Sequence, residues 1–245
     1  MRQAVCRLGG SAVRTALAFA VFLTAQPPNR LTAQVGHNPG DSPYQDIPLH
    51  PSPVFFFGHL SHDRGRAGAG ISNARTFGAR YEIPAGRSLL FQFTAAYLEG
   101  DRFIIDPRAD SASPQRRTGP VAAAIAIADA AIQLRLTGGK TWHGIAPYAG
   151  VGMGLAYDVR SGRDTTGSLY KFGTKFVLNG ATGVRWYPAR RIMVDADLRG
   201  QMWRLKYPVS FHTPAPDGSR VLPLSQPLTD WTLHPWISLG IGWIF

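Results

Sequence analysis

The sequence has very little cysteine, and no long apolar run follows its first 25 residues. The one cysteine, Cys6, has no partner for a disulfide and no second thiolate with which to bind a metal. After residue 25 no stretch reaches the roughly 18 uncharged apolar residues of a transmembrane helix. Basic residues exceed acidic ones by 26 to 15, but no basic stripe with interleaved aromatic residues occurs. We therefore expect no disulfide, no metal or other cofactor, no membrane-spanning helix and no binding of nucleic acid.

The first 52 residues differ from the rest of the chain. Arg2, Arg7 and Arg14 precede an apolar run over residues 15–25, which is typical of an export signal with a cleavage point after Ala25 or as late as Ala33. The alternative, an uncleaved membrane anchor, is disfavoured because this run is shorter than the roughly 17 residues that a spanning helix needs. Residues 26–52 are rich in proline and lack periodicity, so we expect an extended, weakly ordered N-terminal segment.

Residues 53–245 alternate apolar and polar residues with the period of a β-strand. In the last stretch, Ile237, Leu239, Ile241, Trp243 and Phe245 share one face, and glycine or serine occupies most of the other. The alanine-rich stretch 121–136 is also compatible with a buried helix, but Ile132, Leu134 and Leu136 alternate there, which favours a strand. The predicted strands cover residues 53–62, 69–82, 88–99, 121–137, 146–159, 172–187, 192–207 and 230–245.

The links between these strands alternate in length. Residues 83–87, 138–145 and 188–191 form short links, residues 100–120, 160–171 and 208–229 form long ones, and the first link, 63–68, is intermediate. In an up-and-down antiparallel sheet, alternate links lie at opposite ends. Short turns at one end and long loops at the other are typical of outer-membrane barrels. The predicted fold is therefore all-β, an eight-stranded antiparallel up-and-down transmembrane β-barrel.

The polar face of the strands is predicted to line the lumen and the apolar face to contact lipid. Alternation alone does not say which face is inside, but the export signal and the sorted loops favour this orientation. A closed eight-stranded barrel has room only for side chains. We expect a bulge at Gly200, after which the alternation slips in the sequence. The expected polar network of the lumen comprises Gln133, Arg135, Lys175, Arg185, Asp195, Asp197 and Arg199.

Aromatic residues gather near the predicted strand ends, as in the two girdles of a membrane barrel. Those expected at the short-turn end are Tyr81, Trp142, Tyr148, Trp186, Tyr187 and Phe245. Those expected at the long-loop end are Tyr97, Tyr157, Tyr170, Phe172, Trp203, Tyr207 and Trp231.

Three segments resemble a known family. The terminal "ISLGIGWIF" is similar to the last strand of bacterial outer-membrane barrels, and "PYAGVGMGLAYD" (147–158) and "GATGVRWYP" (180–188) resemble strands of the small OmpA/OmpX-type barrels. The resemblance covers residues 53–245. It implies export through the periplasm to the outer membrane, contact with outer-membrane lipid, and recognition by the barrel assembly machinery of the strand that ends at Phe245. It implies no particular activity.

His59 and Ser61 are the candidates for chemistry, because they share a strand face near the long-loop end. A His-X-Ser pair facing the outer leaflet is similar to that of lipid A deacylases, in which serine is the nucleophile and histidine the base. A third group should orient the histidine. Asp63 and Glu82 do not match that role, and only the fold could bring Glu99 or Asp101 close. The alternative is that His59 and Ser61 have no catalytic role and are simply polar residues at the lipid headgroup boundary.

Two further pairs are disfavoured as sites. His59 and His62 point to opposite faces of a strand, which argues against a metal site. Asp195 and Asp197 suit acid–base chemistry, but Arg185 and Arg199 favour a salt bridge in the lumen.

The sequence therefore predicts a structural or binding role displayed through the three long loops, without identifying an extracellular ligand, and enzymatic activity is not the favoured expectation. Two alternatives stay open: an outer-leaflet lipid hydrolase that uses Ser61 and His59, and a narrow pore for small or apolar solutes.

Overall fold

The computed structural model describes residues 42–61, 63–160, 164 and 169–245. The predicted export signal, most of the proline-rich segment and His62 lie outside the described residues. Pro43–Phe245 forms one compact unit. In the described part of the chain, no helix is long and apolar enough to cross a membrane.

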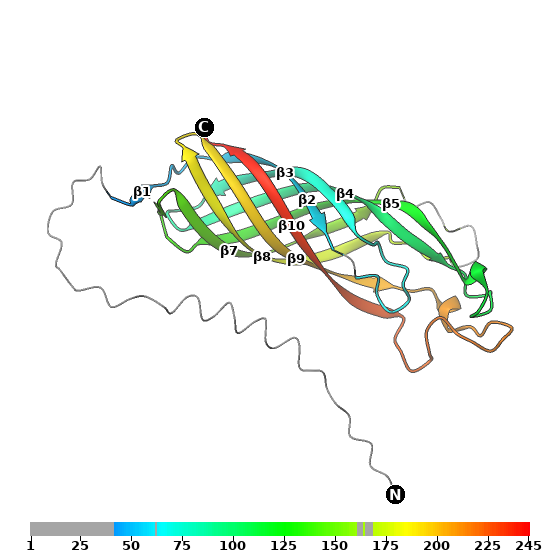
Figure 1. Cartoon of the computed structure of the whole chain (residues 1–245). Helices are drawn as coiled ribbons and strands as arrows, with labels where there is room; N and C mark the ends of the chain where they lie inside the picture. The colour runs from blue at the N-terminus through cyan, green and yellow to red at the C-terminus, as the bar shows by residue number, and fades with distance from the viewer. Residues whose placement is uncertain (1–41, 62, 161–163, 165–168) are drawn as a thin grey trace, which may run out of the picture. The chain divides into compact units, whose positions relative to one another are not determined.

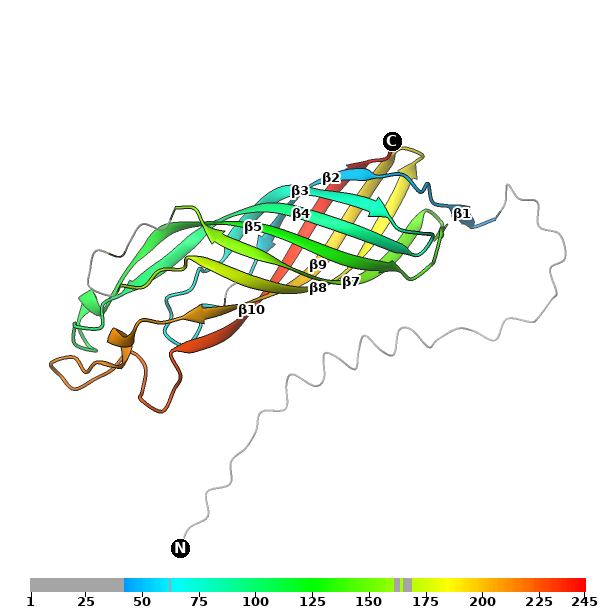
Figure 2. The same ribbon diagram turned by 180° about the vertical axis from the view of Figure 1, so that it is seen from behind.

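Eight long strands form a closed ring, as predicted. Each strand pairs antiparallel with the next in the sequence, and the last pairs with the first, so that the sheet has no open edge (Figures 1 and 2). Closure satisfies the backbone hydrogen bonds that lipid cannot satisfy. The strands of the ring are β2 (Ser52–Leu60), β3 (Ala74–Pro84), β4 (Leu89–Ile105), β5 (Arg117–Arg135), β7 (Ile145–Asp158), β8 (Thr174–Ala189), β9 (Ile192–Lys206) and β10 (Thr229–Trp243).

Short elements lie at both ends of the ring. At the short-turn end, β1 (Tyr44–Asp46) pairs with β6 (Lys140–Trp142), so part of the proline-rich segment is ordered against the barrel. The expectation of a weakly ordered segment is wrong for these residues, because backbone pairing holds them. In the long loops, two 3-10 turns occur, η2 (Pro114–Arg116) and η3 (Val209–His212).

The strands β4 and β5 are longer than the sequence predicts. They continue their pairing to Ile105 and Arg117, beyond the expected ends at residues 99 and 121. The extension projects past the neighbouring strands toward the long loops (Figure 2). Residues 121–135 are part of β5, so the helical alternative is wrong.

The apolar face of the strands is on the outside. Phe55, Val151 and Ile241 are 66–69% exposed, whereas Arg80 and Asp195 are at most 1% exposed. This arrangement is the reverse of a soluble protein and matches a barrel surrounded by hydrocarbon.

No bulge occurs at Gly200 within the described residues of β8, β9 and β10. Gly200 pairs with Gly180 and with Pro235 in unbroken register. The inward alternation of β9 continues through Gln201 to Trp203, which is 1% exposed. The apparent slip in the sequence arises because the lumen itself changes from polar to apolar toward the long-loop end.

The aromatic girdles are thinner than predicted. Tyr148, Tyr170, Phe172, Trp203 and Tyr207 are buried rather than lipid-facing, because they fill the lumen and its outer mouth. Tyr187 is half-buried against a small cluster of Val54, Met193 and Ile244. The outward aromatic residues that remain are Tyr81, Trp142, Trp186 and Phe245 at the short-turn end, and Tyr97, Tyr157 and Trp231 at the other end.

Candidate functional site

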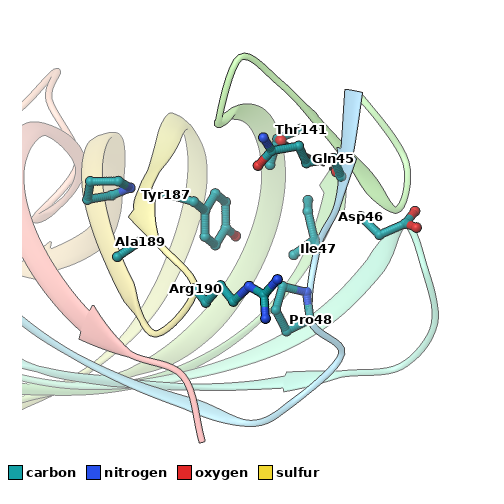
Figure 3. A pocket seen from close by; sticks show the side chains of 9 residues that line it. Gln45, Asp46, Ile47, Pro48, Thr141, Tyr187, Ala189 and Arg190 are labelled. Carbon is teal, nitrogen blue, oxygen red and sulfur yellow. Dashed lines mark hydrogen bonds between the residues drawn. The ribbon is translucent and has the colours of Figure 1, made fainter. Parts of the chain in front are cut away.

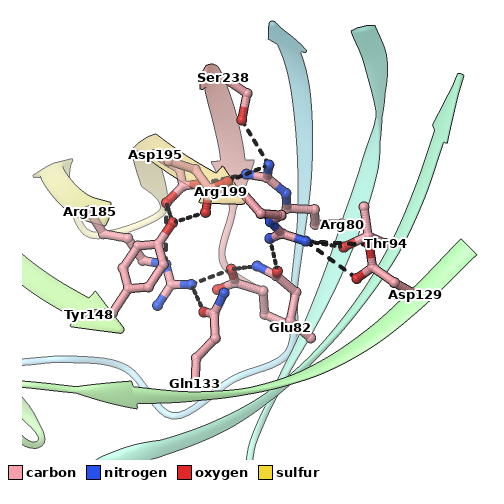
Figure 4. Close-up of polar contacts among 12 residues, drawn as sticks. Arg80, Glu82, Thr94, Asp129, Gln133, Tyr148, Arg185, Asp195, Arg199 and Ser238 are labelled. Atoms are coloured by element: carbon pink, nitrogen blue, oxygen red, sulfur yellow. Dashed lines mark hydrogen bonds and ion pairs between the residues drawn. The ribbon is translucent and has the colours of Figure 1, made fainter. Parts of the chain in front are cut away.

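The lumen contains a layer of fully buried ionic side chains near the short-turn end (Figure 4), which we call the ionic layer. Arg80 of β3 lies at its centre. Its guanidinium donates to Asp195 Oδ2 at 2.8 Å, to Asp197 Oδ1 at 3.0 Å and to Ser238 Oγ at 2.8 Å. The Tyr148 hydroxyl lies 2.9 Å from Asp195 Oδ1 and 2.8 Å from Asp197 Oδ2. Strands far apart in the sequence are thus linked across the barrel.

Two further arginines complete the ionic layer. Arg185 donates to Glu82 Oε1 at 2.6 Å and to Gln133 Oε1. Arg199 donates to Gln92 Oε1 at 2.6 Å and forms an ion pair with Asp129 at 3.3 Å. The expected pairs of the two aspartates are present at longer distances, with Arg185 Nε 3.7 Å from Asp195 and Arg199 Nε 3.3 Å from Asp197.

The ionic layer includes residues that the sequence analysis missed, and leaves out two that it named. Arg135 instead donates to the carbonyl oxygen of Arg87 at 3.4 Å, and the Lys175 ammonium lies 5.7 Å from the Phe172 ring. The missed residues are Arg80, Glu82, Gln92, Thr94, Asp129, Tyr148 and Ser238. For Arg80 and Glu82 the spacing of two in the sequence was a usable signal, since both must share a face opposite Tyr81.

An apolar plug fills the lumen between the ionic layer and the long loops. Trp203 stacks on His234 at 4.0 Å between ring centroids and packs edge-on against Phe172 at 5.9 Å. Phe56 packs against Trp236 at 5.5 Å. Both tryptophans are at most 1% exposed. Charged and apolar side chains therefore fill two successive levels of the lumen, and a solute would have to displace both.

The long loops are joined to one another. At their tips, the Ser111 backbone N–H and hydroxyl each donate to Asp217 Oδ2 at 2.8 Å. Deeper down, Arg102 of β4 pairs with Asp164 at 2.5 Å, and both side chains are buried. Hydrogen bonds from the Ser219 hydroxyl and the Ser111 backbone hold the pKa of Asp217 well below its usual value. We call this joined surface the loop platform.

The two candidates for chemistry differ in their surroundings. His59 points outward and is exposed, in a hollow that is also lined by Glu99 and Asp101. Ser61 follows the end of β2 and is half-buried, and its backbone N–H donates to Pro235 O at 2.7 Å. Within the described residues, the side chains of His59 and Ser61 form no hydrogen bond with each other. The hydrolase hypothesis stays a prediction.

A second hollow of about 480 Å³ lies at the short-turn end (Figure 3). Tyr187 and Arg190 face Ile47 and Pro48 across it. The Ile47 N–H donates to Gly139 O at 2.9 Å, which fixes the segment after β1.

Among the described residues, no group of three or more His, Cys, Asp or Glu side chains is arranged to hold a metal ion.

Comparison with known proteins identifies the fold. No family model and no curated protein matches the sequence. The outer-membrane protein OprG from Pseudomonas aeruginosa is similar in structure, with a TM-score of 0.53 and 11% identity over 84% of this chain and 99% of OprG. Neisserial surface protein A matches at a TM-score of 0.43 and 14% identity over 83% of this chain and 98% of its own. The likeness to OprG and the closed ring of eight strands show that the chain has the fold of the small outer-membrane β-barrels of the OmpA/OmpX type, as the sequence predicts. The similar structures are bacterial outer-membrane proteins, and an outward apolar face is what a barrel in that membrane presents to lipid.

Proposed function

We propose that the barrel is a closed scaffold that presents the loop platform for binding outside the cell. The observation that carries this proposal is the bonding between loops, in which Asp217 holds the tip at Ser111 and Asp164 holds the base at Arg102. Loops fixed in this way lose little entropy when a partner binds, which favours affinity. Export through residues 1–25 and recognition of the strand ending at Phe245 by the barrel assembly machinery complete the proposal and rest on the sequence.

The filled lumen supports binding over passage of solutes. The ionic layer and the apolar plug occupy successive levels of the barrel, and their members are almost wholly buried. Opening a path would separate buried ion pairs, and a buried charge that loses its partner is strongly destabilising.

Two measurements test the proposal. Purified protein inserted into planar bilayers should show no steady conductance, and regular current steps in most insertions would favour the pore instead.

Intact cells that carry the protein should bind members of a panel of immobilised glycans and extracellular matrix proteins. A variant whose residues 107–115 are replaced by a Gly-Ser linker should lose that binding while keeping its heat-dependent gel shift. Equal binding by cells with the wild-type and linker proteins would contradict the proposal.

A further inference from the structure

A groove runs along β5 on the lipid-facing wall of the barrel. Its floor consists of the outward alanines Ala126, Ala128 and Ala130. Large side chains rise on both sides, because the register places these alanines between β4 and β7. The groove comprises two successive hollows of about 520 and 480 Å³. Its walls include Phe77, Phe91, Phe93, Tyr97, Val151, Met153, Leu155 and Tyr157. We call it the β5 groove.

A polar hollow of about 500 Å³ continues the β5 groove toward the long loops. It is lined by His59, Arg75, Glu99, Asp101 and Arg160, with Ala122 and Ala123 of β5. The register shows the continuity, because the pair Phe77–Tyr97 bounds the groove and the next outward pair on the same strands is Arg75–Glu99. We call this hollow the rim hollow.

The change from apolar to polar falls at the level of two outward tyrosines. Tyr97 and Tyr157 line the upper part of the β5 groove, and aromatic side chains of this kind mark the boundary between hydrocarbon and headgroups. The rim hollow therefore lies at the headgroup level of the outer leaflet.

The length of the β5 groove matches one leaflet. From Ala126 to Ile132 is six residues along β5, or about 20 Å at roughly 3.3 Å per residue. With a strand tilt of about 40°, this length covers a depth of about 15 Å, which is half of the roughly 30 Å hydrocarbon core.

The rim hollow offers both signs of charge. The described residues include no ion-pair partner for the side chains of Arg75 and Arg160, nor for those of Glu99 and Asp101. Two guanidinium groups suit a phosphate, and two carboxylates suit a primary ammonium. A headgroup that carries both is phosphoethanolamine.

We propose that the β5 groove and the rim hollow bind one phospholipid with a phosphoethanolamine headgroup. One acyl chain lies over the alanine floor, the phosphate contacts Arg75 and Arg160, and the ammonium contacts Glu99 and Asp101. A second copy of the chain fits this surface less well, because a protein interface over the groove would also have to cover the rim charges. The proposal does not depend on what the loop platform binds.

Native mass spectrometry of the detergent-purified protein tests this proposal, with phosphatidylethanolamine, phosphatidylcholine or phosphatidylglycerol added at equal concentration. We expect phosphatidylethanolamine to bind most tightly. Arg75→Gln should weaken its binding about tenfold, the loss expected for one charge-assisted hydrogen bond. Arg204→Gln is the matched control, since Arg204 is exposed on β9 and bonds Thr229 instead. Glu99→Gln should reduce the preference over phosphatidylcholine, whose ammonium has no N–H.

Two substitutions test the apolar half of the site, the β5 groove. Ala128→Phe fills the β5 groove and should abolish lipid adducts, whereas Ala196→Phe fills a different outward hollow and should leave them unchanged. The heat-dependent gel shift shows that each variant is folded. Equal binding of all three lipids, adducts that survive both Arg75→Gln and Ala128→Phe, or a dimer without lipid that Ala128→Phe dissociates would each overturn the proposal. A preference for phosphatidylglycerol would overturn the assigned headgroup.

Discussion

Replacing Arg80 with methionine should destabilise the barrel strongly. Its guanidinium is buried and bonds Asp195, Asp197 and Ser238 at 2.8–3.0 Å. Methionine retains much of the side-chain volume but leaves two buried carboxylates with one positive charge fewer. Removing one partner of a buried ion pair typically lowers the free energy of unfolding by about 3–5 kcal/mol, and we expect a loss in that range.

The charge of the ionic layer gives this prediction an internal check. Arg80, Arg185 and Arg199 carry three positive charges against four carboxylates, a formal charge of −1. Arg80→Met makes it −2, whereas Asp195→Asn makes it 0 and should lower stability by only about 1–3 kcal/mol. The double variant restores −1. Its loss should therefore be smaller than the sum of the single losses by about 0.5–3 kcal/mol.

Reversible urea unfolding of the barrel in lipid vesicles, followed by tryptophan fluorescence, measures these free energies. The heat-dependent gel shift shows that each variant starts from a closed barrel. A loss below about 1 kcal/mol for Arg80→Met would refute the reasoning, because an ion pair open to water has about that value. Strict additivity in the double variant would refute the charge argument even if the single variants behave as expected.

Three further predictions concern other parts of the molecule. Gly183→Ala should lower the free energy of unfolding by about 1–3 kcal/mol, because the new methyl group would lie 2.5 Å from the Tyr148 hydroxyl, whereas Gly180→Ala meets open space and should be neutral in the same urea assay. Because the pKa of Asp217 is depressed, its stabilising contribution is present above the unfolded pKa and is lost only as pH falls through the lower folded value. The Ser111 N–H should therefore stay protected, relative to the intrinsic exchange rate at each pH, down through about pH 4, where an ordinary aspartate titrates. In Asp217→Ala this protection should be lost at every pH. Trp203→Ala should lower the free energy of unfolding by about 3–5 kcal/mol. Planar bilayers that contain this variant should still show no steady conductance, since the ionic layer blocks the lumen. A steady current would contradict this view.

The eight strands of the ring, and which residues of each strand share a face, were predictable from the sequence, because a period of two is a direct consequence of strand geometry. The short strands β1 and β6 were not predicted. In the alanine-rich stretch 121–136, the alternation of Ile132 with Leu134 was enough to decide for a strand. The extension of β4 and β5 was not foreseen, because residues 100–105 and 117–120 are runs too short to show a period on their own.

The inward aromatic residues were partly predictable. An aromatic residue near a strand end looks the same in the sequence whether it faces lipid or lumen. Parity separates the two cases: Leu198 faces outward, so Trp203 must face inward if the alternation continues through Gly200. In the same way, Val151 outward puts Tyr148 inward.

The sequence alone could not predict which residues of the ionic layer contact each other. Arg80 and Asp195 are 115 residues apart and meet only because the sheet closes with a particular register. The rim hollow has the same origin, since β2, β3, β4, β5 and Arg160, two residues after the end of β7, each contribute to it. Spacing along the chain indicates which face a residue occupies, but closure decides which residues on that face meet.

The apolar plug and the loop platform are parts of one folded unit. Tyr170, Phe172 and Phe211 come from the loop segments, yet they are buried in the same cluster as Trp203 of β9. Tyr207 stacks on Phe211 at 5.8 Å and joins the end of β9 to η3. Segments that bury apolar surface open only at an appreciable free energy, so the plug restrains the loops while the loops cover the plug. Motion that opened the lumen would therefore also disorder the surface proposed to bind, which makes passage and presentation competing properties of this barrel.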